Sequence, residues 1–330
     1  MPKRHKPRAG SLQFWPRKRA KKLVPRVNWK PLEEKYKEGE AGLLGVLGYK
    51  VGMADVIVRD EKPTSLIKGQ ETVLPVSIIE FAPLKILAIR FYGSDGVTDS
   101  EIFNPFARDY KWLKRKVKVS TKEKSKEEII KEIEEKLKDK KIRLLVYTKP
   151  YVIGLKKTPD IFEVGLSGSK ERQLEFIKTK LDKDISVREL IKPKQLVDVR
   201  GVTKGKGTAG PVKRFGIGYK QHKSEKGVRR PGALGPRTPS KISFKAPMMG
   251  QLGFFTRTEY NKYILDVGNA KEKDINKKGG FKNYGLLNGD FVIVKGSVVG
   301  PAKRPLIITL PLRPSRQALK QDNSLVRLNY

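Results

Sequence analysis

The sixty residues from Gly201 to Tyr260 constrain the fold most, because they cannot form an ordinary hydrophobic core. They carry eight Lys and five Arg against two carboxylates, Glu225 and Glu259. Gly and Pro recur too often for a helix, and a structureless stretch of this length within a compact domain is usually functional or disordered. We therefore expect an extension that lies among nucleic-acid phosphates, anchored by the globular parts on either side.

The composition of the whole chain supports a polyanionic partner. A net charge of +37 would create strong self-repulsion unless an anion neutralised it. Nucleic acid is the leading candidate. An anionic membrane is the alternative, but no apolar run approaches the roughly 18 residues of a spanning helix, and the basic stretches lack an apolar helical face. We predict that the chain binds nucleic acid and no membrane.

Cysteine content and the first residues bear on the compartment. The chain has no cysteine, which excludes disulfides, thiolate metal sites and cysteine catalysis. The start is basic but no apolar segment follows it, so it does not resemble a secretory signal. The protein is expected to stay inside the cell, in the cytoplasm.

The first thirty residues form a second basic segment. They contain eleven Lys or Arg and no acid, with Trp15 and Trp29 among the cations. A disordered tail, or a nuclear-import-like run at residues 17–22, is one interpretation. Base stacking on the aromatic rings is the other, and it is favoured because solvated tails are usually poor in aromatic residues.

The rest of the sequence predicts a globular protein with many short strands. Apolar runs bounded by Gly and Pro begin at Gly42 and return after residue 256, and their spacing suggests a closed β-barrel. The charge rises again around 104–119, where Tyr110 and Trp112 lie among cations. The predicted class is α+β, mainly β. The expected parts are a basic N-terminal extension (1–41), a first barrel part (42–104), an α+β insertion (105–194), a barrel strand (195–204), a long basic loop (205–255), a last barrel part (256–315) and a C-terminal tail (316–330).

Three helices are expected within the insertion. Ser125 and Glu128 form a capping box before an apolar stripe of four residues spaced for one helix face. A second helix is expected from about Ser169, and Ser186 with Glu189 should cap a short third one. Charged pairs four residues apart on the first helix are expected to form only a solvated surface.

The glycine motif that opens the basic loop does not indicate a cofactor. Gly205, Gly207 and Gly210 satisfy G-x-G-x-x-G after a predicted strand, but the helix that a dinucleotide-binding turn requires is expected to be absent, since Pro211 follows. A phosphate-binding P-loop fails because its spacing and its Ser/Thr are missing. Without Cβ atoms, these glycines would still let the backbone approach a phosphate closely.

Catalytic and metal-binding constellations are not evident. The chain has two histidines, His5 and His222, both in basic segments, so no histidine relay or metal cluster can be assembled. Glu225 and Glu259 are expected to orient neighbouring cations. We predict no enzyme activity, no cofactor and no metal. The apolar residues of 248–255, Met248 and Met249 among them, are expected to pack the base of the loop onto the barrel, with RNA stacking as the alternative.

Several motifs resemble the universal L-three family of large-subunit ribosomal proteins. They are the basic start PKRHKPRAGSLQFWPRKRA, the segment GLLGVLGYKVGM, VDVRGVTKGKGTAGPVKR, GQLGFFTRTEYNK, KKGGFKNYG and NGDFVIVKGSVVGPAKR, which occur in family order along the whole chain. The long first segment and the helical insertion resemble archaeal and eukaryotic members more than bacterial ones.

The resemblance implies a translation-protein-type barrel on the surface of the large subunit. From it, the long loop and the N-terminal segment would run through ribosomal RNA towards the peptidyl-transferase region. Loop arms of roughly 25 residues could extend up to about 80 Å, which agrees with such a path. Family members bind rRNA early in assembly and shape this region without performing its chemistry.

Two departures from the family pattern lie in the loop, one of them in its tip, about residues 229–241. Eukaryotic relatives carry Trp-His-Pro where this chain has Arg237-Thr238-Pro239, and a histidine that is modified in them falls at about Glu225. Aromatic stacking at the tip therefore cannot be carried over, and the role of the tip stays open. Gln251 matches a glutamine that is methylated in bacterial relatives, which makes it a candidate modification site.

The predicted partners are large-subunit rRNA and neighbouring ribosomal proteins, with no small-molecule substrate and no homo-oligomer. A nucleic-acid architectural protein or RNA chaperone acting outside the ribosome is the alternative, and an RNA-processing enzyme is third. The predicted rRNA-binding residues are Lys3, Arg4, Lys6, Arg8, Trp15, Arg17, Lys18, Arg19, Lys21, Lys22, Arg26, Trp29, Lys204, Lys206, Gly207, Lys213, Arg214, Lys220, Lys223, Lys226, Arg229, Arg230, Arg237, Lys241, Lys245 and Arg257.

Overall fold

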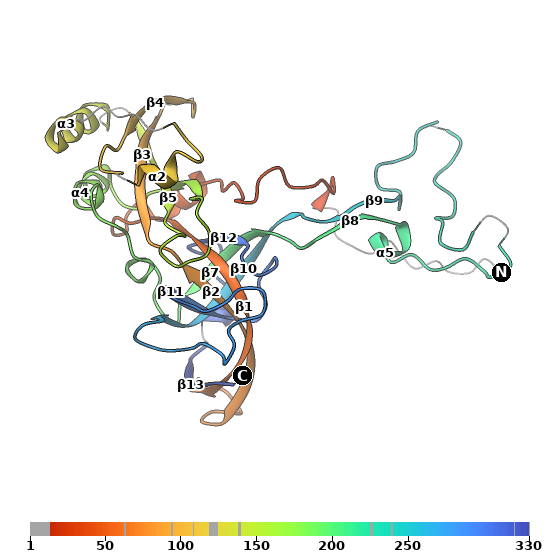
Figure 1. Ribbon diagram of the computed structural model, residues 1–330. Helices are drawn as coiled ribbons and strands as arrows, with labels where there is room; N and C mark the ends of the chain where they lie inside the picture. The colour runs from red at the N-terminus through yellow and green to blue at the C-terminus, as the bar shows by residue number, and fades with distance from the viewer. Residues whose placement is uncertain are drawn as a thin grey trace. The chain divides into compact units, whose positions relative to one another are not determined.

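The computed structural model describes residues 14–62, 64–93, 95–107, 109–118, 125–137, 140–224, 227–238, 240–319 and 321–329. The chain divides into two compact units. The extension unit comprises Met1–Lys22 and Val202–Thr256, and the globular unit comprises Leu23–Gly201 and Arg257–Tyr330. The fold is mainly β with α+β content, as the sequence predicted (Figure 1).

One sheet of seven strands forms the larger part of the globular unit. Its order is β12-β7-β10-β11-β2-β1-β13, and β12 also pairs with β1, so that Gly45 faces Thr309. The strands are β1 (Gly45–Asp60), β2 (Glu71–Phe81), β7 (Leu196–Val202), β10 (Thr256–Asn269), β11 (Asp290–Lys295), β12 (Pro305–Thr309) and β13 (Asn323–Asn329).

The strands of this sheet carry many β-branched and leucine side chains, and residues 45–51 of β1 and all of β12 are buried continuously, as expected where both faces of a sheet are covered. Val46, Ile79 and Ile307 are fully or almost fully buried there. Close packing also requires a glycine in β1, because a Cβ added at Gly48 would lie 2.6 Å from the ring of Phe81. The apolar runs of the sequence are therefore the core of the globular unit.

A second sheet has the order β4-β3-β5-β6. Its strands are β3 (Leu84–Tyr92), β4 (Thr98–Phe103), β5 (Lys141–Thr148) and β6 (Ile161–Gly165). The sequence assigned 84–104 to the first barrel part, but β3 pairs with β5, where Leu84 faces Thr148. The second sheet therefore begins about twenty residues before the expected boundary, because strand pairing over this sequence distance leaves no local signal.

The helices of the insertion form where the capping residues predicted them. In α3 (Lys126–Leu137), the Glu128 amide donates to Ser125 Oγ and the Ser125 amide donates to Glu128 Oε2, both at 3.3 Å. Ser169 is the N-cap of α4 (Lys170–Lys180), and Ser186 accepts from a backbone amide of the short 3-10 helix η2 (Val187–Glu189). Figure 1 shows α3 and α4 beside the second sheet.

The predicted C-terminal tail is wrong, because residues 323–329 form strand β13. It pairs with β1 from Asp60 opposite Asn323 to Asp55 opposite Asn329. Leu325 and Leu328 pack against the core. Three short helices were also not expected from the sequence, namely α1 (Lys30–Lys35), α2 (Tyr110–Leu113) and α6 (Arg316–Leu319).

A buried carboxylate organises the turn before β11. Glu80 Oε1 accepts the amides of Asn288 and Gly289 at 2.8 and 2.7 Å, and Glu80 Oε2 accepts the Tyr284 hydroxyl. Burial raises the pKa of Glu80, although these hydrogen bonds oppose the change. The buried acid therefore acts as a structural acceptor that fixes the loop between β10 and β11.

Membrane-spanning helices and clustered metal ligands are both absent from the described part of the chain. None of its helices has both the length and the apolar character needed to cross a membrane. Within the same residues, no group of three or more His, Cys, Asp or Glu side chains is placed to hold a metal ion.

Candidate nucleic-acid interface

The base of the basic loop is a two-stranded hairpin, which corrects the expectation of an irregular stretch. Strand β8 (Gly205–Ala209) runs antiparallel to β9 (Gly250–Gly253), with Gly205 facing Gly253. Gly253 has φ +69°, and a Cβ added there would lie 2.1 Å from the Lys204 carbonyl oxygen. Only glycine fits this close approach of the two arms.

A short helix follows the glycine motif, so its predicted absence is wrong. Helix α5 (Pro211–Phe215) starts with Pro at its first turn and ends at Gly216, which is left-handed with φ +67°. Proline is tolerated in a first turn because its missing N–H would have no partner in the helix. This helix continues one arm of a β-hairpin and is five residues long, so the βαβ context of a dinucleotide site is still lacking.

Arg214, on α5, holds the two arms of the loop together. Its Nε donates to the Gln251 carbonyl at 3.0 Å and its Nη1 to the Met248 carbonyl at 2.9 Å. Its own carbonyl accepts Arg17 Nη1 at 2.7 Å. Burial, and then the charge of Arg17, lower the pKa of Arg214. Arg214 is therefore mainly a structural cation, because two of its nitrogens already donate hydrogen bonds to backbone carbonyls of the loop.

The N-terminal segment packs into the same unit through aromatic rings. Trp15 stacks on Phe215, with centroids 5.7 Å apart and planes inclined by 20°, and meets Phe244 edge-on at 5.9 Å. The guanidinium of Arg17 lies 4.4 Å from the Phe215 centroid. Phe215 and Phe244 were missed in the sequence, although each has a cation as its direct neighbour, Arg214 and Lys245. Much of the Trp15 ring is thus engaged within the protein.

Two further contacts fix this segment beside the base of the loop. The Ala20 amide donates to the Phe254 carbonyl at 2.9 Å. The Arg19 guanidinium lies 5.2 Å from the Phe254 ring centroid. The cations of residues 17–22 and those of the loop are thus brought together in one unit.

Most predicted cations of the extension unit point into solvent. The exposed ones are Lys18, Arg19, Lys21, Lys22, Lys204, Lys206, Lys213, Lys223, Arg229, Arg230, Arg237, Lys241 and Lys245. Arg17, Arg214 and Lys220 are partly buried. Gly207 is exposed, with φ +64° and open space where a Cβ would lie.

The extension unit carries far more net positive charge per residue than the globular unit. The extension unit has 21 Lys and Arg against one carboxylate, Glu225, whereas the globular unit has 51 against 34. The net charges are +20 and +17 over 77 and 253 residues. Among the described residues of the extension unit, no cation pairs with a carboxylate. Its charge therefore has to be neutralised from outside.

Trp29 does not belong to this interface. Its side chain is 2% exposed and lies in the core of the globular unit, near Leu32. Its predicted role in base stacking is therefore wrong, because a base cannot reach the ring. Arg26 and Arg257 also belong to the globular unit, where Arg26 is exposed and Arg257 is half-buried.

Several predicted residues lie outside the described ranges. They are Lys3, Arg4, Lys6, Arg8, Lys226, Glu225 and Pro239. Glu259, by contrast, pairs with Lys262 at 2.9 Å, which agrees with its expected role of orienting a cation.

The apolar base of the loop is only partly buried. Phe255 is buried, but Met248 and Met249 are exposed, so their predicted packing is wrong. The two methionines follow residues without regular structure and precede β9, where no strand partner covers them. Gln251 is half-buried, and its Nε2 donates to the Gly253 carbonyl at 3.0 Å.

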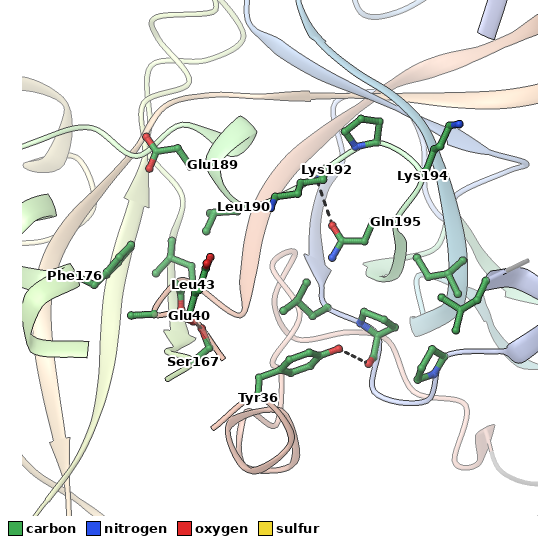
Figure 2. A pocket seen from close by; sticks show the side chains of 18 of the residues that line it. Tyr36, Glu40, Leu43, Ser167, Phe176, Glu189, Leu190, Lys192, Lys194 and Gln195 are labelled. Carbon is green, nitrogen blue, oxygen red and sulfur yellow. Dashed lines mark hydrogen bonds between the residues drawn. The ribbon is translucent and has the colours of Figure 1, made fainter. Parts of the chain in front are cut away.

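The globular unit also contains a groove of about 840 Å³, shown in Figure 2. Its wall is largely apolar and includes Leu43, Phe176 and Leu310, and the Tyr36 hydroxyl donates to the Pro311 carbonyl at 2.9 Å. Two of its three lysines pair with carboxylates: Lys180 with Glu189 at 2.6 Å and Lys194 with Asp322 at 2.5 Å. The groove therefore differs from the extension unit, whose described cations lack such partners.

Comparisons with known proteins agree with this geometry. The family model described as Ribosomal protein L3 matches residues 1–330. Among curated relatives, the "Large ribosomal subunit protein uL3" of Nanoarchaeum equitans is 38% identical and covers 97% of this chain and 95% of its own. Proteins of the same name from Methanospirillum hungatei and Methanothermobacter thermautotrophicus are each 39% identical, with coverage of 97% and 100% of this chain and 96% and 97% of their own. With a family model that spans every residue and archaeal relatives that match almost end to end, the chain belongs to the ribosomal protein L3 family.

Proposed function

We propose that this protein is a structural constituent of the large ribosomal subunit that binds ribosomal RNA through its extension unit. Its relatives carry the name of a large-subunit protein, and the family is structural, not enzymatic. The protein accordingly works in the ribosome, in the cytoplasm. Large-subunit rRNA and neighbouring ribosomal proteins are its partners, and it acts as a single copy, without a small-molecule substrate or a membrane.

The observation that carries the proposal is the charge of the extension unit. A unit with a net charge of +20 and a single carboxylate would repel itself in the absence of a polyanion. The exposed Lys and Arg side chains in the described part of the unit form no ion pair with a carboxylate. RNA phosphates provide that charge at regular spacing. The two arms and the N-terminal segment already hold one another through Arg214, Phe215 and Phe254, so the cations are presented by an organised base.

The chemistry of binding follows from the exposed groups. Lys and Arg neutralise phosphates and release counterions, while open glycine backbone such as Gly207 lets an RNA strand approach closely. These contacts position the RNA and carry little sequence information. Selectivity then comes from the shape of a folded RNA that surrounds the loop.

We infer two finer features of the role. The long basic loop and the N-terminal segment reach into the rRNA near the peptidyl-transferase centre and shape that region. Early binding of this charged unit to rRNA nucleates assembly around it. Arms of roughly 25 residues, with an upper reach of about 80 Å, support such a position.

We also infer that the larger sheet is a closed barrel of six strands. β12 pairs with both β7 and β1, and β10, β11 and β2 continue the order between them, so each of the six has two neighbours. Closure removes exposed edges and gives a rigid base for the loop. The domain plan is then a barrel interrupted by an α+β insertion and by the basic loop, with a basic N-terminal extension.

Co-sedimentation tests the ribosomal role directly. The protein should occur at one copy per large subunit after a moderate salt wash, and purified protein should bind large-subunit rRNA with an affinity that falls steeply with salt. Replacing Lys204, Lys206, Lys241 and Lys245 together with Gln should lower the slope of log Kd against log salt concentration by about 3, since each lost contact contributes about 0.7–0.9.

A matched control removes the same charge elsewhere. Gln at Lys126, Lys131, Lys178 and Lys183, all in the globular unit on or next to α3 and α4, should leave the slope unchanged. Absence of the protein from washed subunits, together with tight binding to unrelated RNA, would instead support an architectural protein or RNA chaperone outside the ribosome.

A further inference from the structure

A second basic and aromatic cluster lies in the globular unit, away from the loop in sequence. It follows β4 and consists of four exposed cations around helix α2, here called the α2 patch: Lys111, Lys114, Arg115 and Lys118. Charge rises here in the sequence, and the function proposed above does not use it. The backbone, the aromatic rings and the carboxylates around the patch distinguish it from an ordinary solvated surface.

The backbone beneath the α2 patch is firmly held. The amides of Trp112 and Leu113 donate to the Asp109 carbonyl at 3.0 Å, and those of Lys116 and Val117 donate to the Leu113 carbonyl at 2.8 and 3.0 Å. The Leu113 side chain is fully buried. A short helix and the hydrogen-bonded turn that follows it, fixed by one buried leucine, therefore present the cations.

The four cations lie within eight residues of chain, at positions 111, 114, 115 and 118. Lys114 and Arg115, in the turn after α2, are three and four positions from Lys111, the spacing that makes side chains neighbours on a helical turn. The phosphates of a nucleic-acid strand carry closely spaced charges of the opposite sign. The α2 patch therefore suits a row of phosphates.

Aromatic rings brace the patch. Trp112 stacks on Tyr151, with centroids 5.1 Å apart and an angle of 20° between the planes. Lys111 Nζ and the Arg115 guanidinium lie 5.3 and 5.5 Å from the Trp112 ring centroid. Because the ring is already covered by Tyr151 and by cations, it orients the charges and is not free to stack a base. The chemistry thus favours the sugar-phosphate backbone.

The nearby carboxylates are engaged with other groups. Asp109 accepts the Tyr147 hydroxyl at 2.6 Å and pairs with Lys149 at 3.4 Å. Asp160 accepts the Tyr49 hydroxyl at 2.8 Å and pairs with Lys116 at 3.5 Å.

The four patch cations consequently make no ion pair to a carboxylate within the described residues. Lysines on α4 of the same unit behave differently: Lys178 pairs with Glu134 at 2.7 Å and Lys180 with Glu189 at 2.6 Å. The unit therefore has carboxylates available, and they neutralise other cations, which leaves the charge of the α2 patch directed outward.

We propose that the α2 patch is a second RNA-binding surface, separate from the extension unit, which binds the phosphate backbone of a large-subunit rRNA helix. This inference rests on the proposed function, because it takes rRNA as the partner. It adds a contact made by the globular unit, so that the barrel and insertion bind RNA themselves instead of serving only as an anchor for the loop.

The test compares hydroxyl-radical footprints and salt dependence for the full-length protein on large-subunit rRNA. The patch variant carries Gln at positions 111, 114, 115 and 118, and the control is the variant with Gln at 126, 131, 178 and 183. The patch variant should lose one discrete set of protected nucleotides and retain those that the 204/206/241/245 variant loses. Its slope of log Kd against log salt should fall by about 3.

Each outcome has a distinct meaning. If the unaltered protein fails to bind large-subunit rRNA, the proposed function itself is wrong. If it binds and the patch variant keeps every protection and the full slope, the second RNA surface is refuted. Unchanged rRNA protection with loss of a crosslink to a neighbouring protein of the subunit would also refute it, and would assign the patch to a protein partner. Superposable circular dichroism and melting curves confirm that the variants are folded.

Discussion

Gly253 offers a sharp test of how the loop base is built. Its φ of +69° and the 2.1 Å separation between an added Cβ and the Lys204 oxygen mean that alanine would be strained and would also collide with backbone. Gly207, in the opposite strand, has φ +64° but open space around its Cβ position. Gly207→Ala is therefore a control that shares the strain and lacks the collision.

The expected costs follow from these two differences. A left-handed conformation costs a non-glycine residue about 1–2 kcal/mol, and this applies to both variants. Overpacking against neighbours that cannot move adds about 1–3 kcal/mol, and this applies only to Gly253→Ala. Since about 1.4 kcal/mol corresponds to a factor of ten, the two variants should differ by roughly 5- to 150-fold in the opening equilibrium of the hairpin.

Hydrogen exchange followed by mass spectrometry measures this equilibrium. Peptides that cover β8 and β9 should exchange faster in Gly253→Ala than in Gly207→Ala by that factor, while peptides from β1 and β2 in the globular unit should be unchanged. Equal exchange in both variants would show that the Lys204 carbonyl does not constrain residue 253, and the close-approach argument would be wrong.

Three further changes test other contacts. Trp15→Ala removes a stacked ring pair worth about 0.5–1.5 kcal/mol and should raise exchange in residues 14–22 several-fold, whereas Lys18→Ala should not. Glu80→Ala leaves two amides and a hydroxyl without their acceptor and should lower the free energy of unfolding in urea by about 3 kcal/mol. Glu71→Ala, which removes only an exposed ion pair with Arg59, is the control and should lower it by less than about 1 kcal/mol. Burial would raise the pKa of Asp109, but the hydrogen bond from the Tyr147 hydroxyl and the charge of Lys149 act against burial, and the pKa is lowered. The contribution of Asp109 to stability should therefore be complete above its ordinary pKa of 3.8 and be lost as the pH falls further. Acid titration monitored by circular dichroism should show a shallower loss of structure in Asp109→Asn, and an identical acid limb would contradict this account.

Features that depend on neighbours in sequence could be predicted. The reciprocal bonds of Ser125 and Glu128 arise within one turn, so a capping box in the sequence was sufficient to locate α3. The apolar strands and the cationic loop were also evident, because alternation, glycine content and charge are local properties. The same local patterns indicated the mainly β class.

Features that depend on distant residues could not be predicted. Trp29 lies among cations in sequence, but glycines at 45 and 165 make room for it: Cβ atoms added there would lie 2.8 and 3.1 Å from its side chain. Strand β13 has a mixed pattern, and its partner β1 is more than 250 residues away. In each case, residues distant in sequence determine the structure: they bury the Trp29 side chain and pair with strand β13.

The same limit applied to the site. The sequence identified the cations of the extension unit but treated Arg214 as equivalent to Lys213. In the fold, Arg214 bridges carbonyl groups of residues 248 and 251, while Lys213 is exposed. Which cation is structural and which is free depends on contacts across some 35 residues of loop, and residue type alone does not encode that difference.

The contacts of Ala20 have a consequence for the order of synthesis. The Phe254 carbonyl that accepts its amide, and the Phe215 ring beside Trp15, belong to residues about 200 or more positions later in the chain. At about 5–20 residues per second, the N-terminal cations leave the translating ribosome roughly 10–50 seconds before their partner Phe254 is made. During that interval the contacts with Phe254 cannot compete with RNA for these cations. The order of translation therefore allows the first segment to engage nucleic acid before the loop that finally holds it in place exists.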